Sequence, residues 1–213
     1  MVCTDACVFP YPRGDTSLRR LCLEARNLGL DSIVCIDAGE RAQIHDVLVR
    51  RGVLIEAGSM QEVVARVKKE QRTADLLLVR AGDGAFNRAA LSYRGVHILR
   101  GLDSAPKRAF DQVSAKNAAD KGVAIDIDLF PLIHRRGASR QKALRCYRDV
   151  LRLHRKFSFP LTISSGARSL LDLRSVREIT RLCAVFGMEP HEVEDALFTV
   201  DALLEPAGPV EVI

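Results

Sequence analysis

Residues 160–177, PLTISSGARSLLDLRSVR, contain one complete unit of the predicted fold. The apolar start, Leu161 to Ile163, has the length and composition of a buried strand. The small residues at 164–167 interrupt that strand, and the amphipathic pattern after them predicts a helix over 172–186, which Gly187 ends. Arg174 and Arg177 lie near the start of this helix. The unit therefore combines a strand, a loop and a cationic helix start suited to an anion.

The same alternation runs through the whole chain. Apolar runs of strand length occur at 2–9, 32–37, 53–57, 74–80, 96–100, 123–129 and 160–164. Helical patterns lie between and after them, chiefly at 17–28, at 59–69 after a Ser59 to Glu62 capping box, at 139–157, at 172–186 and at 190–204. Such units predict parallel strands with right-handed crossovers.

Seven units favour a closed or nearly closed α/β barrel of the TIM-barrel type, with helices around it. A doubly wound open sheet is the alternative. It has little support, because no glycine fingerprint follows the first strand and the glycine-rich stretch at 81–84 lacks the lysine and hydroxyl of a phosphate-binding loop.

The length of 213 residues suits one barrel, and we expect a single α/β barrel domain over 1–205 with a C-terminal tail over 206–213. No apolar run is long enough to span a membrane, and the first residues lack the pattern of a signal peptide, so a cytoplasmic protein is expected. The six cysteines have no CxxC spacing and mostly apolar neighbours, which indicates buried thiols in a reducing compartment.

Charge is unevenly distributed along the chain. Between Ile133 and Leu182 there are thirteen Lys or Arg residues and three acids, whereas the residues from Glu189 onward contain seven acids and no Lys or Arg. The basic segment favours a polyanionic partner, since its excess of arginine suits bidentate phosphate contacts. The acidic segment should then lie away from that partner. The alternative is that basic and acidic helices neutralise each other in the fold.

In such a barrel the carboxyl ends of the strands form the working face. This places several groups in one region: Asp5 and Cys7, Asp37, Arg80, Arg100, Asp126 and Asp128, and residues 164–168.

Several segments in order resemble one known family, the third protein component of archaeal and eukaryotic ribonuclease P, whose fold is similar to the PHP class of metallophosphoesterase barrels. The segments are Ala74-Asp75, Asn87-Arg88-Ala89-Ala90, Phe110-Asp111 with Ala115-Lys116, VAIDIDLFPLI at 123–133, SSGA at 164–167 and DLRSVREI at 172–179. The resemblance covers nearly the whole chain, and its short single-domain form is similar to the archaeal members.

The resemblance implies a protein subunit of an endoribonuclease that removes 5′ leaders from precursor transfer RNA. It implies binding to the ribonuclease P RNA and to a small partner protein, in a heterodimer or heterotetramer, with precursor tRNA bound in the holoenzyme. The family further implies that the catalytic centre lies in the RNA and that this RNA-based holoenzyme uses Mg²⁺. No catalytic residue, cofactor or metal is therefore expected in this chain.

The residues themselves give a separate argument about metals. A PHP-type phosphoesterase would carry paired His and carboxylate ligands, whereas here the first strand has Asp5 and Cys7 and the last strand is followed by Arg168, which cannot ligate a metal. None of the five histidines has a paired ligand spacing. A weak site built from Asp5, Cys7, Asp126 and Asp128 remains an alternative to carboxylates that accept hydrogen bonds from the backbone or from Arg168.

The predicted RNA contacts are cations near the ends of strands and helices. They are Arg80, Arg88, Lys107, Arg108, Lys116, Lys156, Arg168, Arg174 and Arg177. Gln112 stands where the family pattern would have a histidine, so no contact is assigned there. Because aromatic residues are few and Trp is absent, we expect recognition through the backbone and shape of folded RNA and no platform of stacked bases.

Two other classes of function remain open from the sequence. A metal-dependent phosphoesterase would bind metal and turn over substrate by itself, and Asp126→Ala would abolish both. A scaffold that binds only proteins would keep its RNA affinity unchanged after Arg174 and Arg177 are reversed to Glu.

Overall fold

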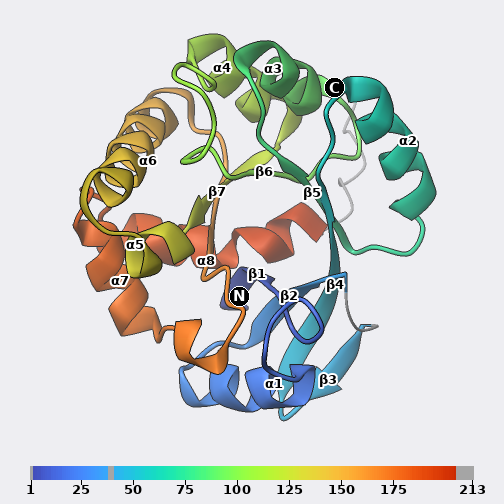
Figure 1. Ribbon diagram of the computed structural model, residues 1–213, viewed down its shortest axis with the longest axis vertical. Coiled ribbons are helices and arrows are strands. Elements are labelled where there is room, and N and C mark those ends of the chain that lie inside the picture. The colour runs from blue at the N-terminus through green and yellow to red at the C-terminus, as the bar shows by residue number, and fades with distance from the viewer. Residues whose placement is uncertain (1, 38–40, 205–213) are drawn as a thin grey trace, which may run out of the picture.

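A computed structural model of the protein describes residues 2–37 and 41–204. Its strands are β1 (Thr4–Val8), β2 (Ser32–Ile36), β3 (Ala42–Ile44), β4 (Val47–Ile55), β5 (Leu76–Arg80), β6 (Ile98–Arg100), β7 (Ala124–Asp128) and β8 (Leu161–Ser164). Seven of them, all except β3, pair in parallel in the order β1-β2-β4-β5-β6-β7-β8 (Figure 1). The predicted seven-stranded α/β barrel is confirmed.

The first and last strands meet and nearly close the barrel. Val8 and Ala167 form a parallel bridge, Phe9 N donates to Ala167 O at 2.7 Å, and Gly166 N donates to Cys7 O at 3.1 Å. The loop after β8 is therefore part of the barrel wall.

The strand prediction was wrong at one place. Residues 42–55 form an antiparallel hairpin of β3 and a long β4, whereas the sequence pattern predicted a strand over 53–57 only. The first part of β4 was not predicted because the charged residues Arg50 and Arg51 interrupt the apolar run. Arg50 is nevertheless buried and paired with Asp201, which neutralises its charge.

The helices surround the strands as predicted. They are α1 (Leu18–Asn27), α2 (Met60–Glu70), α3 (Gly84–Ser92), α4 (Gln112–Lys121), α5 (Phe130–His134), α6 (Gly137–Phe157), α7 (Val176–Ala184) and α8 (Pro190–Leu204), with a 3₁₀ turn, η1, at Leu170–Asp172. Ser59 caps α2 through Glu62 N, but the Glu62 carboxylate accepts from Gly58 N, so the predicted box is shifted by one residue.

The predicted helix over 172–186 is two elements. Asp172 ends η1 within a capping box started by Ser169, and a second box between Ser175 and Glu178 opens α7. Leu173 is extended, with ψ near 148°, and separates them. Two consecutive Ser-x-x-acid signals explain the break, since each satisfies the first amide groups of its own turn.

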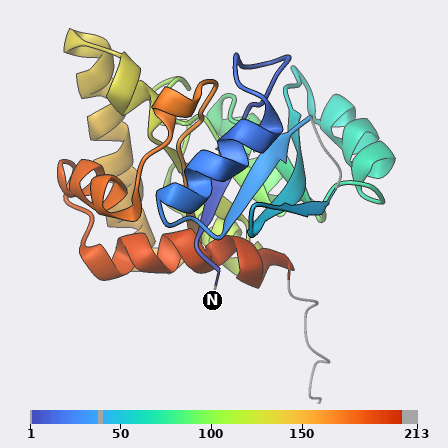
Figure 2. The ribbon, with the colours of Figure 1, turned by 90° about the horizontal axis from the view of Figure 1, so that it is seen from below.

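The barrel interior is apolar at its amino-terminal end. Leu76, Leu78 and Ile98 point inward, while their neighbours Leu77 and Val79 point outward and pack against the helices, as the alternation of a strand requires. Val200 of α8 joins the inner cluster. The acidic helix α8 thus closes this end, beside the N terminus (Figure 2).

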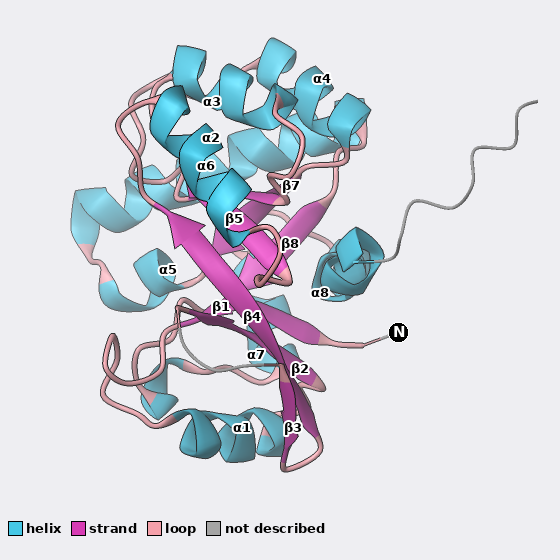
Figure 3. Ribbon diagram, turned by 90° about the vertical axis from the view of Figure 1, so that its right-hand side faces the viewer, coloured by secondary structure: helices cyan, strands magenta, loops and turns pink. Residues whose placement is uncertain are grey.

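The carboxyl ends of the strands open at the opposite end. Figure 3 shows α8 and the N terminus on one side and α5, which follows β7 directly, on the other. The acidic helix α8 therefore lies away from the face where the predicted site residues converge. Within the described residues no helix is both long and apolar enough to cross a membrane.

The predicted tail over 206–213 lies outside the described residues. The division of the chain into one barrel domain over 1–205 and this tail stays a prediction.

Candidate functional site

A layer of polar side chains fills the mouth of the barrel above the apolar interior. Strand alternation places Arg100 above Ile98 on β6, and Asp126 and Asp128 above Ala124 on β7. On β8 the side chains of Thr162 and Ser164 face β7, because both hydroxyls donate to Asp126, at 3.2 and 2.7 Å.

The Arg100 guanidinium lies between the two β7 carboxylates. Its Nη2 donates to Asp128 Oδ2 at 2.5 Å, and its Nε lies 3.7 Å from Asp126 Oδ2. Arg100 is 6% exposed and Asp126 1% exposed. Buried charges require such partners, since each ion loses its hydration. The predicted partner, Arg168, was therefore wrong, and Arg100 takes that role.

Burial changes the ionisation of two carboxyls in this layer. Loss of hydration raises the pKa of Asp126 to about 7 against the opposing effect of Arg100, and raises the pKa of Asp5 to about 6. Asp5 accepts hydrogen bonds from the amides of Cys7 and Ser165, at 3.2 and 3.0 Å, which connect β1 to the loop after β8. Asp5 therefore links the two strands at the barrel closure, whereas Asp126 links β7 to β8.

These two raised pKa values predict a stability that falls as pH rises. Between pH 4 and 7 the folded chain retains protons on Asp126 and Asp5 that the unfolded chain releases, so the free energy of unfolding decreases with pH. Asparagine does not titrate in this range, so Asp126→Asn removes one of the two groups that bind a proton more tightly in the folded chain than in the unfolded chain. We expect the change in unfolding free energy between pH 5 and 8, measured by urea denaturation, to be smaller in Asp126→Asn than in the wild type. An equal change in both proteins would contradict this.

Gly166 adopts a left-handed conformation, with φ near 61°. A Cβ atom there would lie 2.7 Å from Asp128 Oδ1 and 2.8 Å from Arg100 Nη2. Glycine is therefore needed twice, for its backbone angle and for the close approach of the ion pair. This explains the glycine in the SSGA segment.

Phe9 provides an aromatic surface for three arginines at the mouth. The guanidinium carbons of Arg13, Arg168 and Arg100 lie 4.7, 5.4 and 5.6 Å from its ring centre. Arg168 also lies 5.8 Å from the ring centre of Phe130. Cation–π contacts of this kind orient the arginines without neutralising them.

Most charges at the mouth are nevertheless compensated within the chain. Arg13 pairs with Asp37, Arg80 Nη1 lies 3.1 Å from Glu56 Oε1, and Arg135 Nη1 lies 2.7 Å from Asp103 Oδ2. The hollow that remains there measures about 160 Å³. It is smaller than the roughly 300–1,000 Å³ typical of small-molecule sites.

The carboxylates of the mouth are arranged as ion-pair partners. In the described part of the chain, no three His, Cys, Asp or Glu side chains are grouped so that they could hold a metal ion. Asp126, Asp128 and Asp5 instead accept hydrogen bonds from Arg100, Ser164 and backbone amides. The arrangement gives no support to the phosphoesterase alternative.

The nine predicted RNA contacts differ in how much of their charge is already paired. Arg80 and Arg88 form ion pairs with Glu56 and Asp111, at 3.1 and 2.9 Å. Lys156 donates to Gln112 Oε1 at 3.4 Å, and Arg174 Nη1 donates to the carbonyls of Leu171 and Leu173, both at 2.7 Å. Arg168 contacts the rings of Phe9 and Phe130. Within the described residues, no hydrogen bond or ion pair is found for the exposed side chains of Lys107, Arg108, Lys116 and Arg177.

These nine residues do not form one cluster. Arg80 and Arg168 line the mouth, Lys107 and Arg108 lie on the loop between β6 and α4, and Arg88, Lys116 and Lys156 lie on the adjoining helices α3, α4 and α6. Arg174 and Arg177 lie before and within α7. Seven of the cations therefore extend from the mouth over the flank formed by α3, α4 and α6, whereas Arg174 and Arg177 lie at α7, on the other side of α6 from α4 (Figure 1).

Asn87 has a positioning role that was not predicted from the sequence. It is fully buried, and its side chain bonds both backbone groups of Gly82, at 2.8 and 3.1 Å, and the carbonyl of Ala109, at 2.8 Å. It thereby ties the loop before α3 to the loop that carries Lys107 and Arg108. Its place on the inner face of a helical pattern, beside Ala90 and Leu91, was the available signal.

Fold and site together define a class: an α/β barrel of the TIM type whose mouth is filled by internal ion pairs and whose flank carries uncompensated cations. Comparison with known proteins assigns the chain more specifically within this class. A family model described as RNase P subunit p30 matches residues 2–207. The ribonuclease P protein component 3 of Methanothermobacter thermautotrophicus is 34% identical, over 91% of this chain and 85% of that protein.

A second relative, the ribonuclease P protein component 3 of Methanosarcina mazei, is 35% identical over 92% of this chain and 85% of its own length. The protein belongs to the ribonuclease P subunit p30 family, as the resemblance predicted. A chain of a solved structure, the cryo-EM structure of archaeal ribonuclease P with mature tRNA, has the same fold, with a TM-score of 0.77, 20% identity and coverage of 93% and 89% of the two chains.

Proposed function

We propose that this ribonuclease P subunit binds the RNA of the enzyme through its cationic flank and supports removal of 5′ leaders from precursor tRNA. The observation that carries the proposal is the Arg100 guanidinium between Asp126 and Asp128. It uses the carboxylates of the barrel mouth for ion pairing, so the described part of this chain offers no prepared metal-ligand set there. Catalysis is then the task of the RNA, with Mg²⁺ as its metal.

The same proposal includes a small protein partner in the holoenzyme. Support comes from the separation of charge on the barrel: the acidic α8 covers the amino-terminal end, whereas the exposed cations Lys107 and Lys116 lie on the loop before α4 and on α4. One protein can therefore present a cationic face to RNA and a separate face to another subunit.

The RNA contacts can be tested at α7. Arg177 is exposed, and Arg174 holds its own loop through two backbone carbonyls while keeping its positive charge. We expect the double variant Arg174→Ala/Arg177→Ala to bind ribonuclease P RNA more weakly. Its salt slope should be smaller by about one for each phosphate that the variant no longer binds.

The measurement is filter binding or fluorescence anisotropy with transcribed ribonuclease P RNA over a series of salt concentrations. Arg66→Ala/Lys69→Ala on α2 is the control of equal charge change, because both residues are exposed on a helix without any predicted contact. An unchanged slope in the α7 variant would remove these two arginines from the RNA site.

A further inference from the structure

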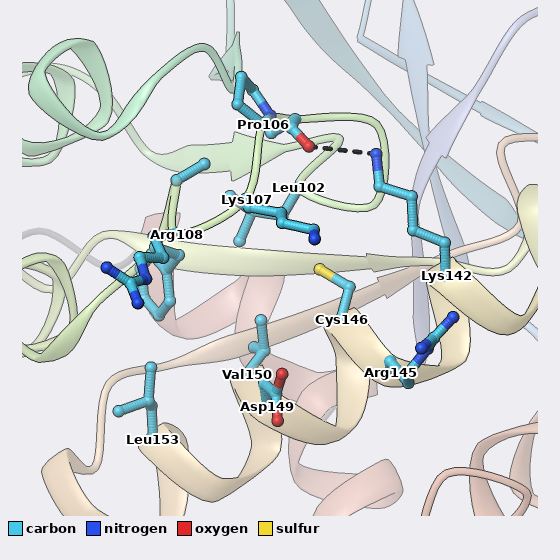
Figure 4. Close-up of a pocket in the computed structure, with 13 residues that line it drawn as sticks. Leu102, Pro106, Lys107, Arg108, Lys142, Arg145, Cys146, Asp149, Val150 and Leu153 are labelled. Carbon is cyan, nitrogen blue, oxygen red and sulfur yellow. Dashed lines mark hydrogen bonds between the residues drawn. The ribbon is translucent and has the colours of Figure 1, made fainter. Parts of the chain in front are cut away.

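A second hollow lies on the flank of the barrel, outside its mouth. It measures about 630 Å³ and lies between α6 and the loop that joins β6 to α4. We name it the α6 groove and define it by its apolar floor, Leu102, Phe110, Cys146, Val150 and Leu153, and by the charged residues of its rim, Lys107, Arg108, Lys142, Arg145 and Asp149. Figure 4 shows the Cys146 sulfur directed into the space between helix and loop.

The rim of the α6 groove is strongly cationic. Lys107 and Arg108 come from the loop and Lys142 and Arg145 from α6, against the single carboxylate of Asp149 (Figure 4). All four cations are exposed, and within the part of the chain that the structure describes none has a carboxylate within ion-pair distance. Asp149 itself lies 3.7 Å from Arg152, in an exposed pair.

This rim contrasts with the mouth of the barrel, where Arg13, Arg80, Arg100 and Arg135 each have an acidic partner. The α6 groove therefore carries more uncompensated positive charge than the mouth does. Two backbone carbonyls accept from the rim: Lys142 Nζ donates to Ala105 O at 3.2 Å, and Arg145 Nε donates to Gln141 O at 3.3 Å. These bonds orient the side chains and leave their charge uncompensated.

The groove is also held in shape before any ligand arrives. Asn87 fixes the carbonyl of Ala109 at 2.8 Å, Asp111 caps α4 through Ser114 N at 2.9 Å, and Arg108 adopts a left-handed backbone with φ near 61°. A left-handed conformation is uncommon for arginine and costs free energy that the surrounding contacts must offset. It directs the loop so that two consecutive cations reach the rim.

An apolar floor beneath a cationic rim matches the two chemical parts of a nucleotide, a base with apolar faces and an anionic phosphate. Groove residues recur on α6 from Lys142 to Leu153, a distance of about 16 Å at 1.5 Å per residue. That length exceeds one nucleotide and suits a short single strand. We propose that the α6 groove binds a short single-stranded segment of the ribonuclease P RNA, with one unstacked base on the floor and its phosphates on the rim.

The inference rests on the proposed function and goes further than backbone contacts alone. Single-stranded RNA binds proteins through unstacked bases on apolar or aromatic side chains together with cations that follow the backbone. Phe110 supplies the one aromatic ring of the groove. Recognition of a single base there is compatible with the low aromatic content of the chain, which argues only against an extended stacking platform.

Cys146 provides a test that needs no substitution. Of the six cysteines it alone is partly exposed, and the other five are buried. Burial and nearby carboxylates raise its pKa to about 12, so alkylation is slow and its rate responds to coverage. We expect saturating ribonuclease P RNA to slow N-ethylmaleimide labelling of Cys146 several-fold at pH 8.5, as measured by peptide mass spectrometry. An equal mass of RNA duplex should protect it less.

A variant with a larger side chain at position 146 distinguishes binding of a base on the groove floor from binding of phosphates at the rim. Cys146→Phe occupies the floor without changing any charge, so we expect about tenfold weaker binding to ribonuclease P RNA with an unchanged salt slope. Lys107→Ala/Arg108→Ala should instead lower the slope. Ala65→Phe, at an exposed position on α2, is the matched control, and thermal melting checks that each variant folds.

The inference is overturned if the wild type binds the RNA but neither labelling of Cys146 nor the Cys146→Phe variant responds. It is overturned equally if Cys146→Phe keeps full RNA affinity and instead loses a protein that co-purifies with the wild type, because the groove would then be a protein site. Failure of the wild type to bind ribonuclease P RNA at all would refute the proposed function itself, which is a different result.

Discussion

Replacing Arg100 by Leu is expected to destabilise the barrel by about 3–5 kcal/mol at pH 8. The substitution leaves the Asp128 carboxylate without its 2.5 Å donor and removes the cation beside Asp126. Asp126 is 1% exposed and the Asp128 side chain is 13% exposed, so neither carboxylate can regain full hydration. Leucine has no donor to offer them. The effect is a large fraction of the stability of a typical domain.

Urea denaturation of the purified variants measures this effect. Arg80→Leu is the control, because Arg80 and Glu56 form a pair in which each side chain is 51% exposed, and such pairs contribute about 0–1 kcal/mol. Since the predicted loss comes from an uncompensated carboxylate, the double variant Arg100→Leu/Asp128→Asn should be more stable than Arg100→Leu alone. An Arg100→Leu protein within about 1 kcal/mol of the wild type would refute the structural role of this pair.

The second large effect concerns RNA affinity. We expect simultaneous replacement of Lys107, Arg108, Lys116 and Arg177 by Ala to weaken binding to ribonuclease P RNA roughly 100- to 1,000-fold at physiological salt, with a salt slope smaller by about three. Among the described residues these four have no side-chain hydrogen bond or ion pair, and the same holds for Arg168, which contacts the rings of Phe9 and Phe130 instead. Their charge is therefore free for phosphates, whereas Arg80 and Arg88 would first have to leave a carboxylate.

The control replaces four exposed cations of α2 and its end, Arg66, Lys68, Lys69 and Arg72, by Ala. It produces the same change in net charge on an element without predicted contacts. If general attraction of a basic protein to a polyanion explained binding, both variants would lose affinity equally. A loss confined to the first variant would show that the RNA contacts at least one of the three places that carry these residues, which are the loop before α4, α4 itself and α7.

The strands of the barrel could be predicted because their apolar runs are strong and regular. Strand β5, with four buried residues in succession, and β7, with its Asp126 and Asp128 alternation, are examples. The hairpin of β3 and β4 was missed because Arg50 and Arg51 interrupt the pattern, and the burial of Arg50 depends on its pairing with Asp201, far away in sequence. Local patterns contain no information about such a partner.

The candidate site was predictable to a similar extent. Alternation placed Asp126 and Asp128 together at the mouth, and the sequence identified them as acceptors. It could not select Arg100 over Arg168 as their donor, because that choice depends on which side chain enters the barrel and which lies over Phe9. The α6 groove brings residues 102–110 and 142–153 together, and neither segment alone suggests a hollow.

Affinity purification of the tagged chain from its own cells, followed by sequencing of the RNA that remains after a moderate salt wash, tests the central claim most directly. We expect strong enrichment of ribonuclease P RNA with the wild type and clearly reduced enrichment with the four-fold variant of Lys107, Arg108, Lys116 and Arg177. Absence of enriched RNA, together with stoichiometric transition metal and phosphoesterase turnover by the purified chain, would contradict it.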